Sequence, residues 1–335
     1  MRALLPIVLL ALAACDGGHG AVELSGSTMG TQFNVKLPDG IGDYAPLELQ
    51  NEIEAALDDA EAEMSTYQWE SVITQFSVSD SVGWYEVSDA FCGKVQKSLQ
   101  ISDLTGGAFD ITVSPLVNLW GFGPADIVDT IPKDATVATL LEITGYEHLQ
   151  ADCTQPAIKK DIAELMLDMS AIGKGFAADR VAKLIEDLGF ESYLVEVGGE
   201  LRIRGKNASG NDWAIGIEAP LIGKREPHTV IHLTDTAMAT SGDYRNFFEV
   251  DGQRFSHTID TRTGKPVTHS LASVTVVDKM AWRADALATA LLVMGPEDGL
   301  AFAEREGMAV LMLLRTDDGI EERQTTAFAT FRDAS

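Results

Sequence analysis

Hydrophobic residues recur at three- and four-residue steps in two long stretches of the chain. In residues 47–64 they fall at Leu49, Ile53, Leu57 and Met64, and acidic residues fill many of the positions between them. This period places the apolar side chains on one face of a helix and turns the charged side chains toward water. The same argument predicts a helix over residues 174–188, and further helices are predicted over residues 88–104, 135–143, 282–294 and 297–305.

Shorter runs rich in β-branched and aromatic residues lie between the predicted helices. Residues 193–197 and 201–204 are separated by only a few residues around Gly198 and Gly199. So short a connection favours antiparallel pairing, because parallel neighbours need a long crossover. The remaining predicted strands span residues 33–37, 213–218, 230–233, 255–259, 273–277 and 310–314. The predicted class is α+β, with mixed, largely antiparallel sheets packed with helices.

The first 22 residues differ from the rest of the chain. Met1 and Arg2 precede an apolar run, residues 3–14, which has the length of a signal-peptide core and is too short to span a bilayer. The run ends in Leu-Ala-Ala-Cys, which resembles the lipobox that is acylated at cysteine, here Cys15. We expect a signal peptide over 1–14 and a lipidated tether over 15–22. An ordinary cleaved signal with an incidental cysteine, or a buried apolar strand, are the alternatives.

Asp16, directly after the cysteine, resembles the signal that retains lipoproteins at the bacterial inner membrane. The expected location is therefore the periplasmic side of that membrane, with the lipid at Cys15 as anchor. No linker, low-complexity run or repeat divides the chain after residue 22, so one domain is expected over residues 23–335.

The chain is strongly acidic, with a formal net charge of −26, and 45% of its residues are hydrophobic, which is ample for a core. Nucleic-acid binding is excluded, because a phosphate backbone would be repelled. Besides Cys15 there are two cysteines, Cys92 and Cys153. An oxidising compartment would permit a disulfide between them, although their spacing does not show that they meet. No cysteine or histidine pattern suggests zinc.

Three glycine-containing segments could approach a ligand closely. They are residues 26–31 (Gly-Ser-Thr-Met-Gly-Thr), 105–112 (Thr-Gly-Gly-Ala-Phe-Asp-Ile-Thr) and 168–175 (Asp-Met-Ser-Ala-Ile-Gly-Lys-Gly). The third leads into a predicted helix, and its glycines, hydroxyl and lysine are residue types that meet phosphate at a helix N-terminus. Each segment is equally well explained as a turn or a helix cap.

Two further segments carry residues suited to catalysis or metal binding. His257 and Asp260 lie three residues apart near the end of a predicted strand, where positions 257 and 260 would face opposite sides, so a direct dyad is not implied. Asp285 and Thr289 lie four apart in an otherwise apolar helix and thus on one face. A carboxylate above a hydroxyl suits Mg²⁺, which takes oxygen ligands, whereas a dipole-stabilised aspartate beside a back-bonded threonine is the structural alternative.

Taken together and in this order, these segments resemble the FAD:protein FMN transferase family, often called ApbE. The resemblance covers residues 24 to 315 and is carried by eight ordered motifs: residues 27–31, 64–67 with Phe76-Ser77, 107–112, 168–175, 197–200, 240–244, 257–266 and 284–289. It implies an ApbE-like fold, similar to the tunnelling fold. This chain departs from the usual pattern at Met169, Ser170, Gly173 and Thr261, and none of these changes removes a charged or metal-binding group.

The resemblance also implies roles for individual residues. FAD would be bound by Met29, Tyr67, Ala108, Phe109, Asp110, Asp168, Lys174 and Ile259. Mg²⁺ would be held by the backbone carbonyl of Ala171 and the side chains of Asp285 and Thr289. His257 would act in the transfer step, and Lys174 could add positive charge at the pyrophosphate.

The implied reaction moves the FMN half of FAD onto a serine or threonine hydroxyl of another protein and releases AMP. The expected acceptors are periplasm-facing proteins, such as subunits of membrane redox complexes, with a motif similar to Asp-x-x-(Ser/Thr)-Gly-Ala-(Ser/Thr). Two alternatives stay open: a Mg²⁺-dependent FAD pyrophosphatase that uses water as acceptor, and a non-catalytic FAD-binding lipoprotein.

Overall fold

The computed structural model describes residues 20–124, 130–221, 223–224, 226–244, 247–250 and 253–332. The predicted signal peptide and the lipidation site at Cys15 lie outside the described residues. Among the helices that the model describes, none is long and apolar enough to cross a membrane.

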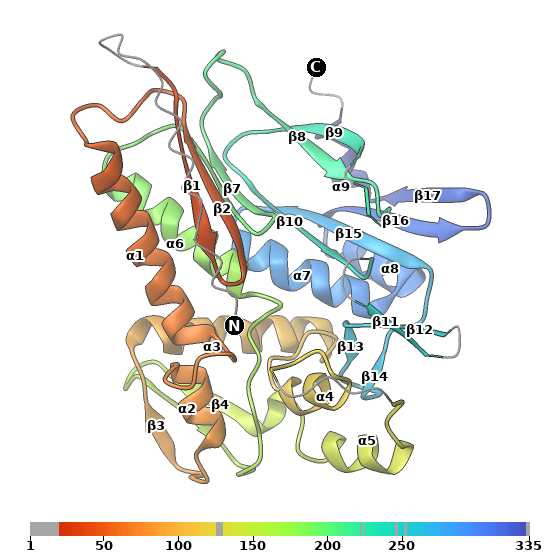
Figure 1. Ribbon diagram of the computed structural model, residues 1–335. Helices are drawn as coiled ribbons and strands as arrows, with labels where there is room; N and C mark the ends of the chain where they lie inside the picture. Colours follow the sequence, from red (N-terminus) through yellow and green to blue (C-terminus); the bar gives the residue numbers. More distant parts are fainter. Residues whose placement is uncertain are drawn as a thin grey trace, which may run out of the picture.

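An eight-stranded antiparallel sheet forms the centre of the molecule (Figure 1). Its order is β1-β2-β6-β7-β10-β15-β16-β17, so the strands lie side by side in the order in which they occur along the chain. Its strands are β1 (Val22–Thr28), β2 (Thr31–Leu37), β6 (Tyr193–Val197), β7 (Glu200–Arg204), β10 (Ala237–Gly242), β15 (Leu271–Asp278), β16 (Ala309–Thr316) and β17 (Gly319–Gln324).

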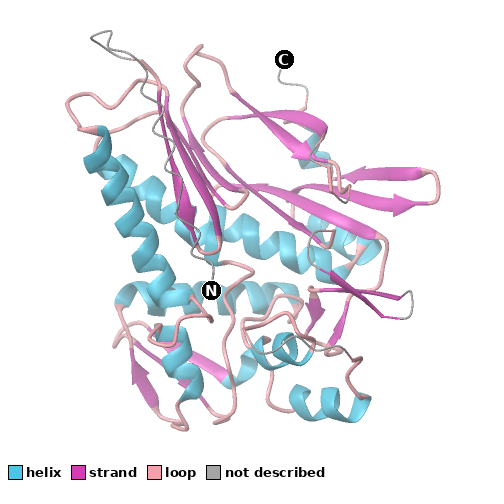
Figure 2. Ribbon diagram, viewed as in Figure 1, coloured by secondary structure: helices cyan, strands magenta, loops and turns pink. Residues whose placement is uncertain are grey.

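Four helices cover one face of this sheet (Figure 2). Their apolar sides form the main core with the sheet, and the face predicted for the first helix is buried there at Leu49, Ile53, Leu57 and Met64. The helices are α1 (Pro46–Met64), α6 (Gly173–Asp187), α7 (Ala281–Met294) and α8 (Pro296–Arg305).

The opposite face of the sheet is only partly covered. The hairpin of β8 (Trp213–Glu218) and β9 (Pro227–Leu233) and the short helix α9 (Thr326–Ala329) form a second apolar cluster against it. The other small elements form a lobe beyond one end of the sheet: α2 (Val72–Val78), β3 (Trp84–Glu86), α3 (Asp89–Thr105), α4 (Ser114–Leu119), α5 (Asp134–Leu141), a 3₁₀ turn (Tyr146–His148), β4 (Leu149–Asp152), β5 (Ala157–Lys160), β11 (Phe247–Val250), β12 (Gln253–Ser256), β13 (Ile259–Asp260) and β14 (Lys265–Pro266).

The α+β class and the antiparallel pairing are confirmed, and the predicted helices are present within two residues at each end. The strand predicted over 255–259 is wrong, because β12 ends at Ser256 and β13 begins at Ile259. Between them the Ser256 hydroxyl accepts from the Thr258 N–H (3.1 Å), a local turn that interrupts the extended backbone.

Helices α6 and α7 approach each other so closely that only a glycine fits between them. A Cβ atom on Gly175 would lie 2.5 Å from the backbone oxygen of Ala281 and 2.6 Å from the Cα of Trp282. The next residue of α6, Phe176, stacks on Trp282 with ring centroids 5.6 Å apart. The Asp179 carboxylate accepts from the N–H groups of Ala281 (3.1 Å) and Trp282 (2.9 Å), which satisfies free donors at the start of α7. These contacts fix the register of the two helices.

Cys92 and Cys153 form a disulfide that joins α3 to the segment after β4. The bridge closes a separation of 61 residues. Closing a loop of that size lowers the entropy of the unfolded chain and stabilises the fold by about 2–4 kcal/mol.

We therefore expect Cys153→Ser to lower the free energy of unfolding by about 2–4 kcal/mol. Cys153 is partly exposed, so its serine substitution leaves no cavity, whereas Cys92 is fully buried. Denaturant unfolding with and without reductant measures the effect. Reductant should bring the wild type to the stability of the variant and leave the variant unchanged; a reductant-insensitive wild type would contradict the prediction.

Candidate functional site

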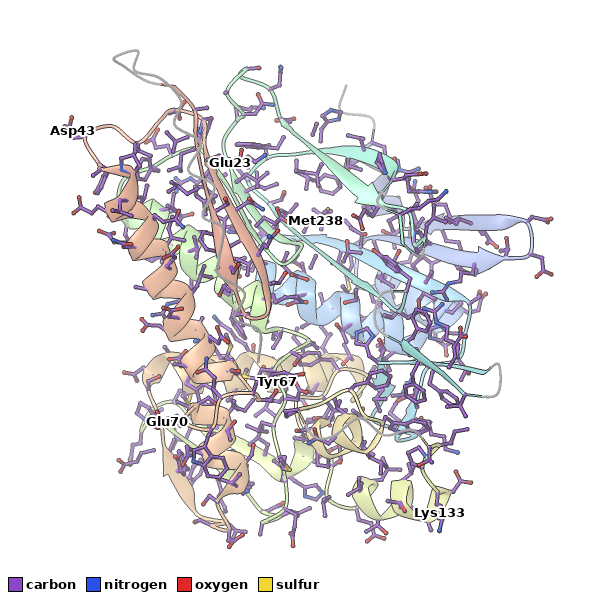
Figure 3. All side chains as sticks on the ribbon, viewed as in Figure 1. Glu23, Asp43, Tyr67, Glu70, Lys133 and Met238 are labelled. Carbon is purple, nitrogen blue, oxygen red and sulfur yellow. A yellow bond between two sulfur atoms is a disulfide. The ribbon has the colours of Figure 1, made fainter. Side chains whose placement is uncertain are left out.

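A cavity of about 410 Å³ opens where α6, α7 and the sheet meet the α3–α4 segment and the β12–β13 turn. Eleven of the twelve residues expected to form the site line this cavity: Tyr67, Ala108, Phe109, Asp110, Asp168, Ala171, Lys174, His257, Ile259, Asp285 and Thr289. Tyr67, labelled in Figure 3, is 72% exposed and lies at the opening. Segments far apart in the sequence are thus brought together by the fold.

Met29 does not line the cavity. It occupies the two-residue turn of the β1–β2 hairpin with Gly30, and both residues have positive φ (48° and 70°), as such tight hairpin turns require. Its N–H donates to Glu61 Oε2 (3.3 Å), and its side chain lies next to Gly173. Met29 therefore supports the start of α6, and its contact with FAD stays a prediction.

Asp110 forms part of the floor of the cavity and is fixed by hydrogen bonds. Its carboxylate accepts from the N–H and hydroxyl of Thr112 (both 2.8 Å) and from the N–H of Tyr146 (2.9 Å). Burial raises the pKa of Asp110 to about 6, against the lowering effect of these hydrogen bonds. The segment 108–110 is consequently a rigid wall.

Asp168, the first residue of the loop that precedes α6, fixes the position of that loop through two hydrogen bonds. The Asp168 N–H donates to the Ile111 carbonyl (2.7 Å), and its carboxylate accepts from the Ser170 N–H (2.7 Å). The first bond ties the loop to the 105–112 segment and the second closes a turn within the loop, from which Ala171 and Lys174 line the cavity.

Lys174, Glu200 and Asp285 form a charged cluster in this wall. Lys174 Nζ lies 3.0 Å from Glu200 Oε1 and 3.9 Å from Asp285 Oδ1, and the Gly175 N–H donates to Asp285 Oδ2 (3.0 Å). Asp285 and Glu200 are each only 2% exposed. The Gly-Gly-Glu turn between β6 and β7 belonged to a sequence motif, but Glu200 was not predicted as a site residue.

The cluster holds two carboxyl groups and one ammonium. Burial raises the pKa of Glu200 to about 8 and also raises that of Asp285, although Lys174 opposes both shifts. Burial would lower the pKa of Lys174, but the two carboxylates hold it above its ordinary value. Lys174 is therefore charged, and the cluster favours an additional positive charge, which can be a proton or a cation.

The residues present fit a bound Mg²⁺. The Thr289 hydroxyl lies one helical turn beyond Asp285, hydrogen-bonds the Ser241 hydroxyl (2.9 Å) and lines the cavity together with Ala171. Mg²⁺ is held by one or two carboxylates and completes its shell with water and phosphate oxygens, so a single carboxylate among neutral oxygens is sufficient. Among the described residues no group of three or more acidic, histidine or cysteine side chains is arranged to hold a metal ion.

His257 also lines the cavity and lies in the turn between β12 and β13. Its ring meets Phe122 edge-on with centroids 6.2 Å apart. Asp260 instead binds Arg262, whose Nε and Nη2 lie 2.8 and 3.0 Å from its two carboxylate oxygens. The hydroxyl of Thr261, a departure from the family pattern, donates to the Gly107 carbonyl and joins this turn to the 105–112 segment.

Asp179, which lies outside the cavity lining, makes the stability of the protein depend on pH. Burial raises its pKa to about 6, against the lowering effect of the two N–H donors of α7 and of Arg202. The protonated Asp179 carboxyl is favoured in the folded protein, because its pKa there is about 6 and that in the unfolded chain is about 4. The stabilisation is complete below pH 4 and is lost as the pH rises through about 6.

We expect the free energy of unfolding to fall by about 2 kcal/mol between pH 4 and pH 7 through Asp179 alone. Asp179→Asn should reduce this decline, which urea titrations across the pH range measure. Asp278→Asn serves as the control, because Asp278 ends β15 just before α7 and its carboxylate binds Arg283. An unaltered pH dependence in Asp179→Asn would show that the group titrates normally.

Comparisons with known proteins place these features in context. The family model described as ApbE family matches residues 29–312. The FAD:protein FMN transferase of Vibrio cholerae is 44% identical over 323 residues, which is 96% of either chain. That of Escherichia coli K12 is 40% identical over 310 residues, covering 92% of this chain and 88% of the relative.

Solved structures show the same fold. The flavin transferase ApbE from Vibrio cholerae superposes with a TM-score of 0.86 at 42% identity and covers 93% of this chain and 99% of the other. The apo form of the Pseudomonas stutzeri flavinyl transferase ApbE gives a TM-score of 0.86 at 39% identity, with 95% and 98% covered.

Proposed function

The chain belongs to the ApbE family and is a flavin transferase that moves FMN from FAD to proteins, and we propose that it does so with Mg²⁺ onto a serine or threonine hydroxyl. One observation carries the finer proposal. Asp285 and Thr289, a turn apart on α7, line the same cavity as Lys174 and His257. The candidate metal ligands, the lysine ammonium and the candidate general base therefore all line one cavity.

FAD would place its pyrophosphate at the Lys174–Asp285 end of the cavity. Lys174 is positively charged there and can neutralise a phosphate oxygen, while Ala171, Asp285 and Thr289 would hold the metal. Bound Mg²⁺ supplies charge neutralisation that makes the phosphorus open to attack. Tyr67 and the rigid segment 108–110 would contact the rest of the flavin nucleotide.

In the transfer step an acceptor hydroxyl oxygen forms a bond to the phosphorus of the FMN half of FAD. The bond between that phosphorus and the bridging oxygen breaks, and AMP departs with the bridging oxygen. His257 takes the hydroxyl proton, so FAD and the protein hydroxyl give FMN-protein, AMP and one proton. A positioned base of this kind contributes about 10²–10⁴-fold to the rate.

His257→Gln is accordingly expected to lower the single-turnover rate of transfer by about 10²-fold or more, with FAD binding retained. His148→Gln is the matched control, because His148 binds Asp161 and does not line the cavity. Quenched-flow measurement at saturating FAD separates the step from binding. A rate within a fewfold of the wild type would remove His257 from the proton transfer.

The proposal as a whole is tested with purified protein, FAD, Mg²⁺ and a carrier protein that bears the motif Asp-x-x-Thr-Gly-Ala-Thr. Covalent flavin fluorescence on the carrier in a denaturing gel is expected, and chelation of Mg²⁺ should abolish it. Release of free FMN and AMP with an unlabelled carrier would favour a pyrophosphatase, and intact FAD would favour a binding protein.

We also propose that the mature enzyme is a lipoprotein at the periplasmic side of the inner membrane. The support is the sequence around Cys15 and Asp16, together with the disulfide, which suits an oxidising compartment. Acceptors would then be subunits of membrane redox complexes facing the periplasm. Growth with a labelled fatty acid should label the wild type and leave Cys15→Ser unlabelled; an unlabelled wild type would contradict the anchor.

A further inference from the structure

A second groove, of about 610 Å³, lies on the opposite side of the sheet from α6 and α7. One wall is the polar half of the sheet face, with Gln32 and Asn34 of β2 and Glu196 of β6. The other wall is the strand β8, whose six residues all line the groove, whereas no residue of β9 does. Met238, labelled in Figure 3, belongs to the floor.

The edge of β8 that faces the groove carries unpaired backbone groups. In the β8–β9 ladder Ala214 lies opposite His232, whose N–H donates outward to the Phe331 carbonyl (3.3 Å). Ala214 and His232 are therefore a non-hydrogen-bonded pair, because the two residues of a bonded pair point their N–H groups at each other. The pattern repeats every second residue, so Ala214 and Gly216 both direct N–H and C=O away from β9 and into the groove.

These outward backbone groups have no hydrogen-bond partner among the described residues. Ala214 and Gly216 are exposed, and no hydrogen bond to another described residue engages their outward groups. Alanine and glycine have the smallest side chains, so they present no steric obstacle to the backbone of an approaching strand. On either side of this pair, Trp213 and Ile217 are buried in the apolar cluster under the hairpin. An exposed edge of this kind is a template for an added strand.

The groove and the cavity adjoin each other at three residues. Gly198, Thr240 and Gly242 line both. A Cβ atom on Gly198 would lie 2.8 Å from Thr31 Cγ2, on the groove side, and 2.9 Å from Lys174 Cδ, on the cavity side. Gly198 therefore lies between the groove and the part of the cavity that Lys174 lines.

We propose that the protein to be flavinylated docks here, with an extended segment that pairs with the outer edge of β8 and delivers its hydroxyl past Gly198 to the cavity. The proposal rests on the transferase function, since a protein acceptor must reach the pyrophosphate end of FAD. Backbone pairing with Ala214 and Gly216 recognises an extended chain, and the small side chains of β8 favour an acceptor segment rich in small residues. Recognition is thus mainly through the backbone, whatever the acceptor's own fold.

The test substitutes Ala214 with proline, which removes the outward N–H and leaves the β8–β9 bonds intact. Ala214→Ser, which keeps the N–H at similar size, is the matched control. With the carrier that bears the acceptor motif, Ala214→Pro should raise the KM for the carrier by about fivefold to tenfold, with the KM for FAD and the kcat within twofold of the wild type. An unchanged KM for the carrier in a folded Ala214→Pro protein would overturn the proposal.

Hydrogen exchange of the wild type provides an independent measurement that needs neither turnover nor a variant. Adding the carrier without FAD should slow exchange of the β8 amides; protection elsewhere with none in β8 would also overturn the proposal. Failure of the wild type to label the carrier would instead count against the function. A change in molar mass of Ala214→Pro with an unchanged KM would show that β8 pairs with a second copy, again overturning the proposal.

Discussion

Asp285→Asn is expected to lower the rate of FMN transfer by about 10³-fold or more while the protein remains folded. The substitution removes the only carboxylate on the α7 face that lines the cavity, and loss of a bound Mg²⁺ removes several kcal/mol of transition-state stabilisation. Asparagine keeps the shape and an oxygen that can accept from the Gly175 N–H. The measurement is the single-turnover rate at saturating FAD over a Mg²⁺ titration.

The stability of Asp285→Asn should change little or rise, because the substitution takes a buried carboxyl group out of a cluster with excess negative charge. Asp179→Asn is the matched control: this aspartate lies at the same α6–α7 interface and also has a raised pKa, but it does not line the cavity. It should retain transfer within a fewfold. Equal losses of transfer in the two variants would show that helix packing, and not a metal ligand, is responsible.

Gly175→Ala is expected to lower the free energy of unfolding by roughly 3 kcal/mol. In an open helix the same change would stabilise by about 0.5–1 kcal/mol. Here the added methyl carbon would meet the α7 backbone at 2.5 to 2.7 Å, and backbone cannot turn aside as a side chain can. The helices must separate, which also moves Lys174 away from Asp285 and should reduce transfer.

Gly93→Ala in α3 is the matched control, because no atom lies within 4 Å of the position that its Cβ would take. It should raise the free energy of unfolding by about 0.5–1 kcal/mol. Both values follow from denaturant titrations at constant pH. If Gly175→Ala proved as stable as the wild type, the close approach of α6 and α7 would not be rigid.

The features that sequence could predict are local or follow from repeated spacing. The helical period indicated α1, and the four-residue spacing alone placed Asp285 and Thr289 on one face of α7. The ordered motifs then assigned the same family that the comparisons show. Each of these depends only on residues near one another along the chain, or on their order.

The features that could not be predicted depend on contacts between distant segments. Glu200 meets Lys174 only because the β6–β7 turn folds over the start of α6, and the Ser241–Thr289 pair depends on β10, a strand that the hydrophobic pattern did not indicate. Pairing of Cys92 with Cys153 was likewise undecided. The free edge of β8 emerges only from the register of its ladder.

The most direct measurement of Mg²⁺-dependent FMN transfer is a single-turnover reaction in which the enzyme, FAD and the motif-bearing carrier are mixed and both products are counted by mass spectrometry. With Mg²⁺ present, the carrier should gain one FMN moiety for every AMP released, and Asp285→Asn should form neither at a comparable rate. AMP released together with free FMN, while the carrier keeps its unmodified mass, would contradict transfer.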